Sequence, residues 1–248
     1  MISLKKIIVE GRYDSLVTEL SRKMLTIIKD SYAAVTAPDG KFAGESIYYK
    51  SEKEAPAITS DDCPHIFFEE VENSTIPLEF YLILKVQWIA GLADFRYGGD
   101  AYNETKTYSD DMPLIEVRFE LDPADYPTIL SNVAMQLRDV LRHEIEHLTQ
   151  SGWNTNPIKY IKSDQALRNK IESGKLPAAR YFTLPKETPA MLQGMYLKAK
   201  KSKTPFSKVI NDYLDLWVSN NTITDIDKQQ IIDTWRTYLP KLGIRQEL

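Results

Sequence analysis

Two histidines and a glutamate near the middle of the chain have the spacing of a metal site. His143 and His147 lie four residues apart, and Glu144 directly follows the first of them, in an H-E-x-x-H pattern. On a helix the two imidazoles share one face, one turn apart, where both can ligate a single metal ion. A glutamate at the second position can then act as a general base on a water molecule at that metal. The pattern therefore predicts metal-dependent hydrolytic chemistry.

The helix that carries this pattern is expected to run from about residue 127 to residue 150. At 100° per residue, His143 and His147 lie about 40° apart on its surface. The apolar side chains fall between about 120° and 200° on the same wheel; they are Leu130, Ala134, Leu137, Leu141, Ile145 and Leu148. The histidine pair therefore faces away from the core, which favours a metal site over two buried structural histidines. Asp139, one turn before His143, is a candidate partner for an imidazole N–H, or else a solvent-facing residue.

A catalytic zinc ion normally has three protein ligands and a water, so the two histidines need a third partner. No His follows His147, and a downstream carboxylate is the natural third ligand. The stretch Glu187-Thr188-Pro189-Ala190 resembles the E-x-x-A setting of the glutamate-zincins, metallopeptidases in which a second helix supplies this ligand. The resemblance implies a Zn²⁺ ion held by His143, His147 and Glu187.

Other carboxylates and one histidine are alternatives to Glu187. Pro189 could place the helix start after Glu187, which would then be only a favourable anion at a helix N-terminus. In that case the third ligand would come from Glu172, Asp164 or His65.

If the site is built this way, roles in catalysis follow from its chemistry. Glu144 would accept a proton from the attacking water and pass it to the leaving amine. Tyr181 or Tyr196, on either side of Glu187, could stabilise the oxyanion; with 14 tyrosines in the chain, a structural role is the alternative for each. In zincins an edge strand near the motif helix binds an extended peptide, and this strand is expected within 77–88 or 114–121.

The rest of the chain predicts an α+β fold. A helix is expected over 11–30, because Leu16, Leu20, Met24, Ile27 and Ile28 recur at helical spacing. Alternating or β-branched segments predict strands, and helical periodicity dominates after the motif. The predicted strands are 46–50, 65–71, 77–86, 93–97 (ending in Gly98-Gly99) and 114–121, and the later helices are 157–172, 186–200, 206–218 and 223–238.

This order of elements predicts a small antiparallel or mixed sheet, then the motif helix, then a mainly helical C-terminal half. We expect a single zincin-like domain over residues 1–248. Within it, 1–124 would hold the N-terminal helix and sheet, 125–200 the metal-site helices, and 201–248 the C-terminal helices.

Composition limits the partners. The net charge of −4 and pI near 5.5 give no electrostatic reason to expect nucleic acid or an anionic membrane. A single cysteine, Cys63, excludes an intramolecular disulfide. No stretch approaches the ~20 apolar residues of a membrane helix, and the N-terminus lacks a signal-peptide pattern. We expect a soluble, cytoplasmic protein whose oligomeric state the sequence leaves open.

The function expected from these features is zinc-dependent hydrolysis of peptide bonds in a peptide or protein substrate. Two alternatives remain at this point. The same chemistry could act on a non-peptide amide, or the metal could only stabilise the fold of a non-catalytic binding or structural protein. A fourth protein ligand would favour the structural role, whereas an open coordination position would favour the enzyme.

Overall fold

The computed structural model describes residues 13–36, 39, 41, 46–48, 67–73, 78–102, 113–149, 166–246 and 248. The chain forms two compact units, and we call them the sheet unit (Leu16–Glu144) and the helical unit (Met1–Ser15 with Ile145–Leu248). Helix α3 (Leu130–Thr149) begins in the first unit and ends in the second. The expectation of a single domain stays a prediction.

The sheet unit is built on five strands, so the fold is α+β with a mixed sheet. The strands are β1 (Ser46–Tyr48), β2 (Phe67–Asn73), β3 (Leu78–Ile89), β4 (Arg96–Tyr102) and β5 (Leu114–Leu121). Their order is β1-β3-β5-β4, and β2 pairs with the other end of β3. The pair β3–β5 is parallel and the remaining pairs are antiparallel. Strand β4 is therefore an edge strand among the described strands.

Alternation along the strands gives the sheet one apolar face. Leu84 of β3 is level with Val117 of β5, and Val117 is level with Gly99 of β4. The buried side chains of this face repeat every second residue; they are Phe80, Leu82, Leu84, Val86 and Trp88 of β3 and Ile115, Val117, Phe119 and Leu121 of β5. Glu116 and Arg118 of β5 point to the opposite face, where Glu116 pairs with Lys85 at 2.8 Å.

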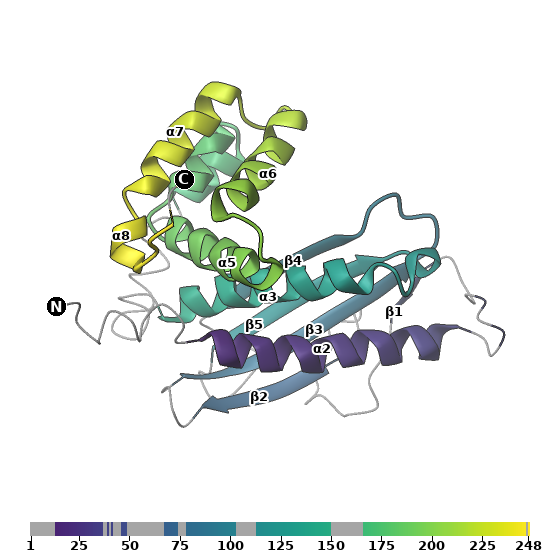
Figure 1. Cartoon of the computed structure of the whole chain (residues 1–248). Helices are drawn as coiled ribbons and strands as arrows, with labels where there is room; N and C mark the ends of the chain where they lie inside the picture. The colour runs from purple at the N-terminus through teal and green to yellow at the C-terminus, as the bar shows by residue number, and fades with distance from the viewer. Residues whose placement is uncertain are drawn as a thin grey trace. The chain divides into compact units, whose positions relative to one another are not determined.

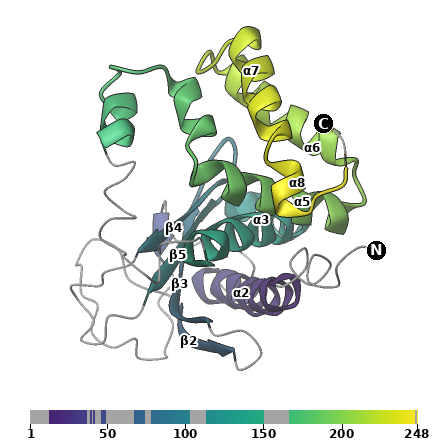
Figure 2. The same cartoon turned by 90° about the vertical axis from the view of Figure 1, so that its left-hand side faces the viewer.

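Helices α2 (Asp14–Val35) and α3 lie on the same face of this sheet (Figures 1 and 2). Apolar residues of α2 at helical spacing are buried, among them Leu20, Met24 and Ile28. The Trp88 indole N–H donates to Ser31 Oγ at 2.9 Å, which fixes the end of α2 against β3. Helix α2 continues to Val35, beyond the predicted end near residue 30, and its last turns bury Ser31 and Val35.

Strand β4 differs most from the prediction. The sequence places a strand at 93–97 and ends it at Gly98-Gly99, whereas the structure starts β4 at Arg96 and carries both glycines inside it. Each glycine is paired with β5, Gly98 with Arg118 and Gly99 with Val117. Neither has a positive φ, so neither marks a turn. The other predicted strands and helices lie within a few residues of those observed, except where residues 49–66 and 150–165 lie outside the described part.

The helical unit packs short helices around one apolar core. Its elements are η2 (Ala178–Thr183), α5 (Glu187–Ser202), α6 (Phe206–Ser219), α7 (Asp225–Arg236) and α8 (Leu239–Leu242), with a further helical stretch over 166–172. Phe182, Leu192, Phe206, Ile210 and Trp235 lie at the centre of the core. The Trp235 indole N–H and the Thr188 hydroxyl both donate to the Phe182 carbonyl oxygen, at 2.7 and 3.1 Å. These bonds fix η2 between α5 and α7.

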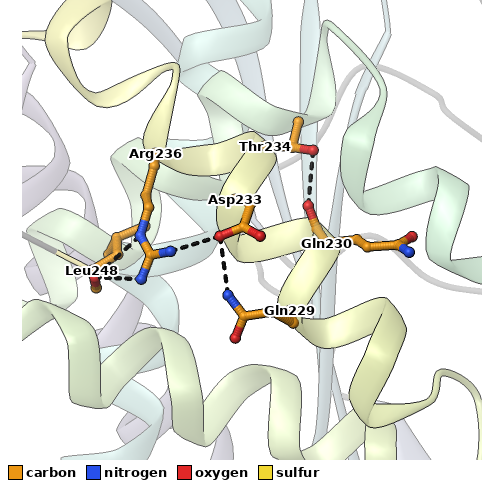
Figure 3. Close-up of polar contacts among 6 residues, drawn as sticks. All are labelled: Gln229, Gln230, Asp233, Thr234, Arg236 and Leu248. Atoms are coloured by element: carbon orange, nitrogen blue, oxygen red, sulfur yellow. Dashed lines mark hydrogen bonds and ion pairs between the residues drawn. The ribbon is translucent and has the colours of Figure 1, made fainter.

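The ends of α7 are satisfied by side chains. Thr224 and Asp227 form a reciprocal capping box at its start, and hydrogen bonds from Thr224 lower the pKa of Asp227. At the other end, the Arg236 guanidinium donates to Asp233 and to the main-chain oxygen of Leu248 (Figure 3). Among the described residues, no helix is both long and apolar enough to cross a membrane.

Candidate metal centre

The H-E-x-x-H residues form one compact group on a continuous helix. One ligand atom from each of His143, Glu144 and His147 lies within 4.8 Å of the other two. Because all three residues belong to α3, their relative placement follows from helical geometry. The group has the donor types that bind zinc and other transition metals, so it could hold a metal ion.

The histidines lie at the edge of the buried part of α3, whereas the helical wheel places them opposite its apolar stripe. Leu137, Leu141 and Ile145 are fully buried, and the His147 side chain keeps 13% of its surface exposed. The buried arc is wider than predicted, because Val133, Val140 and Glu144 are buried as well. Strand β4 accounts for the extra width at Val140 and Glu144, since its backbone lies against both side chains at Gly99.

Glu187 is the first residue of α5, which settles the uncertainty about the helix start. Pro189 occupies the third helical position, where the backbone N–H that proline lacks would have no partner within the helix. The Glu187 side chain is 2% exposed, so its carboxylate is buried and must be met by polar partners.

One of those partners is a motif histidine. Glu187 Oε1 lies 3.4 Å from His147 Nε2, and both residues belong to the helical unit. Two ligand atoms each about 2.1 Å from a tetrahedral zinc ion are about 3.4 Å apart. The separation is thus the one expected of two ligands to one ion, and the donor types are a common zinc pair. The residues present could therefore hold a metal ion.

Two further side chains hold the Glu187 carboxylate. Tyr181 Oη donates to Glu187 Oε2 at 2.9 Å, and Arg168 Nη2 donates to Oε1. The Arg168 guanidinium also lies 5.6 Å from the centre of the Tyr181 ring. The Tyr181 bond to Oε2 is of the kind that orients metal-ligating carboxylates in proteins, whereas Arg168 contacts Oε1, the atom nearest His147. The arrangement is therefore suited to holding Glu187 in one orientation.

Tyr181 stays protonated over the whole physiological range. Burial and then the negative charge of Glu187 raise the pKa of its hydroxyl well above the usual range. Phe182, the next residue, is anchored in the core of the helical unit by its ring and by its carbonyl oxygen. The donor that faces Glu187 is consequently held by the fold of the helical unit.

The other predicted site residues lie elsewhere. Tyr196 is in the core of the helical unit, with its ring against Phe206 and near the Lys200 ammonium group. Its catalytic role, like that of Tyr181, stays a prediction. Glu172, an alternative ligand, is exposed at the end of the helical stretch 166–172. Asp164 and His65 lie outside the described residues.

Three residues near the motif were not singled out from the sequence. Arg168 reaches Glu187 across 19 residues of chain, a contact without any local sequence signal. Gly99 lies against Glu144, and only its position in an otherwise alternating strand hints at a close approach. Tyr97, which is 41% exposed, lies near Asp139, one turn before His143; partial burial and then the Asp139 charge raise the pKa of Tyr97 to about 12.

Comparison with known proteins adds no assignment. No protein-family model matches the chain, and neither a curated protein nor a solved structure matches it significantly.

Proposed function

We propose that this protein is a zinc-dependent hydrolase of the glutamate-zincin type that cleaves peptide bonds. His143, His147 and Glu187 would hold the zinc ion, and Glu144 would act as general base. The observation that carries the proposal is the 3.4 Å separation of Glu187 Oε1 from His147 Nε2. It joins the E-x-x-A helix to the H-E-x-x-H helix at the ligand spacing of a tetrahedral ion.

When bound, zinc supplies a Lewis acid that polarises a carbonyl group and lowers the pKa of water. Glu144 accepts the proton of the attacking water and returns it to the leaving amine, so that the carboxylate is regenerated. Its burial at 5% exposure suits this role, since a proton acceptor is more effective where bulk water is excluded. Peptide bond cleavage then consumes one water and releases one amine and one carboxylate.

The hydroxyl of Tyr181 is engaged with the Glu187 carboxylate. We therefore assign Tyr181 to holding this ligand, in place of the oxyanion role expected from its position in the sequence. Arg168 supports the same carboxylate and adds a positive charge beside it. A positive charge at this point favours anionic species near the metal, including the oxyanion that forms during hydrolysis.

We assign the binding of extended substrate to β4. The two segments first expected to do this, 77–88 and 114–121, form β3 and β5, which are both paired on two sides. Strand β4 pairs with β5 alone among the described strands, and its backbone lies against Glu144. A peptide added to the outer edge of β4 would make main-chain hydrogen bonds next to the proposed base.

The proposal is tested with zinc-loaded protein and denatured casein, with mass spectrometry of the products. Wild-type protein should release new peptides, and a zinc chelator should stop the reaction. Glu144→Gln should bind as much zinc as wild type and lose about 10²–10⁴-fold in rate, which is the usual contribution of a general base.

Two results would contradict the proposal. If Glu144→Gln cleaves as fast as wild type, Glu144 is not the base. If wild-type protein binds zinc but cleaves neither casein nor a broad peptide library, the metal has a structural role.

A further inference from the structure

Gly99 is the point where the sheet comes closest to the motif helix. A Cβ atom built on Gly99 would overlap Val140 Cγ1 and lie 3.0 Å from both Cγ and Oε1 of Glu144. Real Cβ atoms rarely approach another atom so closely, so a hydrogen atom is the substituent that this position accepts. All of these residues belong to the sheet unit.

The need for glycine is one of space and not of backbone conformation. Gly99 lies within β4, paired with Val117, and its φ is not positive. Glycine inside a strand costs about 0.5–1 kcal/mol relative to alanine, because it gains no side-chain packing and loses more chain entropy. That cost is unnecessary unless another group must come close. The groups found there are Val140 Cγ1, which is the nearest, and the side chain of Glu144.

We propose that Gly99 is a positioning residue for Glu144, whose carboxylate it admits against the backbone of β4. This inference rests on the proposed function, in which Glu144 is the general base. The contact limits where the Glu144 carboxylate can lie: α3 fixes one end of the side chain and β4 bounds the other. General bases act within hydrogen-bond reach of the proton that they accept, and a displacement of about 1 Å can cost roughly 100-fold in rate.

The neighbouring glycine is a matched control. Gly98 is in the same strand and also has no positive φ, but a Cβ atom built on it meets nothing within 4 Å. The two glycines alternate in direction, so Gly98 faces away from α3. Alanine at residue 98 and alanine at residue 99 therefore change strand propensity equally, and only the second crowds Glu144.

The experiment compares full-length Gly99→Ala and Gly98→Ala with wild type. The readouts are zinc content, zinc affinity, and kcat and KM on one peptide that wild-type protein cleaves. Gly99→Ala should keep its zinc and lower kcat at least tenfold, with KM within threefold of wild type. In cobalt-loaded protein its visible absorption should shift as it does in Glu144→Gln. Gly98→Ala should match wild type in every readout.

Three outcomes would overturn the inference. One is a wild-type kcat in Gly99→Ala. A second is a loss of kcat that only follows a loss of zinc. The third concerns the double variant Gly99→Ala/Val140→Ala, which is made if Gly99→Ala alone does not fold. This variant removes the overlap with Val140 and leaves the crowding of Glu144. A wild-type kcat in the double variant would overturn the inference, because Gly99 would then act through Val140 alone.

The proposed function fails in a different way. Wild-type protein that takes up neither zinc nor cobalt would contradict the metal site itself, and the inference about Gly99 with it. A failure confined to Gly99→Ala leaves the metal site and the role of Glu144 standing.

Discussion

Arg168 neutralises the buried carboxylate of Glu187, which is also the proposed third zinc ligand. Substitution of Arg168 should therefore destabilise the protein more without zinc than with zinc bound. Glu187 Oε1 accepts a hydrogen bond from Arg168 and lies beside His147. Substitution Arg168→Met keeps much of the aliphatic stem and removes the charge and the donor. The Glu187 side chain, 2% exposed, cannot recover this loss from water. Zinc bound at Oε1 would supply a positive charge in its place.

The size of the effect follows from the contact. A hydrogen bond to a charged group contributes about 1.5–3 kcal/mol, and the 29% exposure of the Arg168 side chain places it at the low end, about 1.5–2 kcal/mol. This corresponds to a fall in Tm of about 3–8 °C for a chain of this size. With zinc bound, we expect Arg168→Met to be less stable than wild type by about 1 kcal/mol or less, which is similar to the contribution of a neutral hydrogen bond. The stability lost in Arg168→Met is thus about 1 kcal/mol smaller with zinc than without it. By linkage, Arg168→Met should bind zinc about fivefold more tightly than wild type does.

The assay is urea unfolding of wild type and Arg168→Met, each with chelator and with saturating zinc, alongside a competition measurement of zinc affinity. Arg180→Met is the control, because Arg180 is an exposed arginine on η2 of the same unit. The difference in stability between Arg180→Met and wild type should be small both with chelator and with saturating zinc. Equal deficits for Arg168→Met with and without zinc would refute the reasoning, as would weaker zinc binding.

Substitutions of two tyrosines test the zinc ligand and the stability at high pH. Tyr181→Phe removes the neutral donor to Glu187 Oε2, and we expect zinc affinity to fall about tenfold in a competition assay; unchanged affinity would show that the hydroxyl does not hold the ligand. Because the pKa of Tyr97 is raised to about 12 from 10.0, its contribution to stability is complete below pH 10 and lost as the pH rises towards 12. Tyr97→Phe should therefore reduce the loss of stability between pH 10 and pH 12 in alkaline unfolding experiments, and an identical profile would contradict this assignment.

Periodicity predicted the elements whose residues pack in a regular pattern. The alternation of residues 114–121 gives β5 with its observed bounds, and the spacing of Leu16, Leu20 and Met24 gives most of α2. The ends of elements were harder to predict where distant residues set them. Helix α2 runs on to Val35, and within this extension Ser31 contacts Trp88, which is 57 residues away along the chain.

Strand β4 shows the limit of local signals most clearly. Paired glycines usually mark turns, since they accept backbone conformations that other residues avoid. At Gly98 and Gly99 neither glycine adopts such a conformation, and both lie in the strand. The reason for glycine at residue 99 is its close approach to Val140 and Glu144, which only the packing of α3 on the sheet creates.

In the candidate site, spacing alone predicted the group on α3. His143, Glu144 and His147 are placed by one helix, so their geometry is local. The short E-x-x-A pattern identified Glu187, which the structure places beside His147. Arg168 could not be predicted, because a single arginine carries no pattern and its partner lies on another helix. Tyr181 was predicted for its proximity in sequence, which gave the residue but not its contact with Glu187.

The central claim is that one zinc ion binds to His143, His147 and Glu187. The most direct test is the zinc content of purified protein after saturation with zinc and removal of the excess, for wild type, Glu187→Ala and Glu172→Ala. Glu172 is an exposed glutamate of the helical unit and the alternative ligand. We predict about one zinc per chain for wild type and Glu172→Ala, as a single site requires, and little or none for Glu187→Ala. Zinc-free wild type, or full zinc in Glu187→Ala, would contradict the claim.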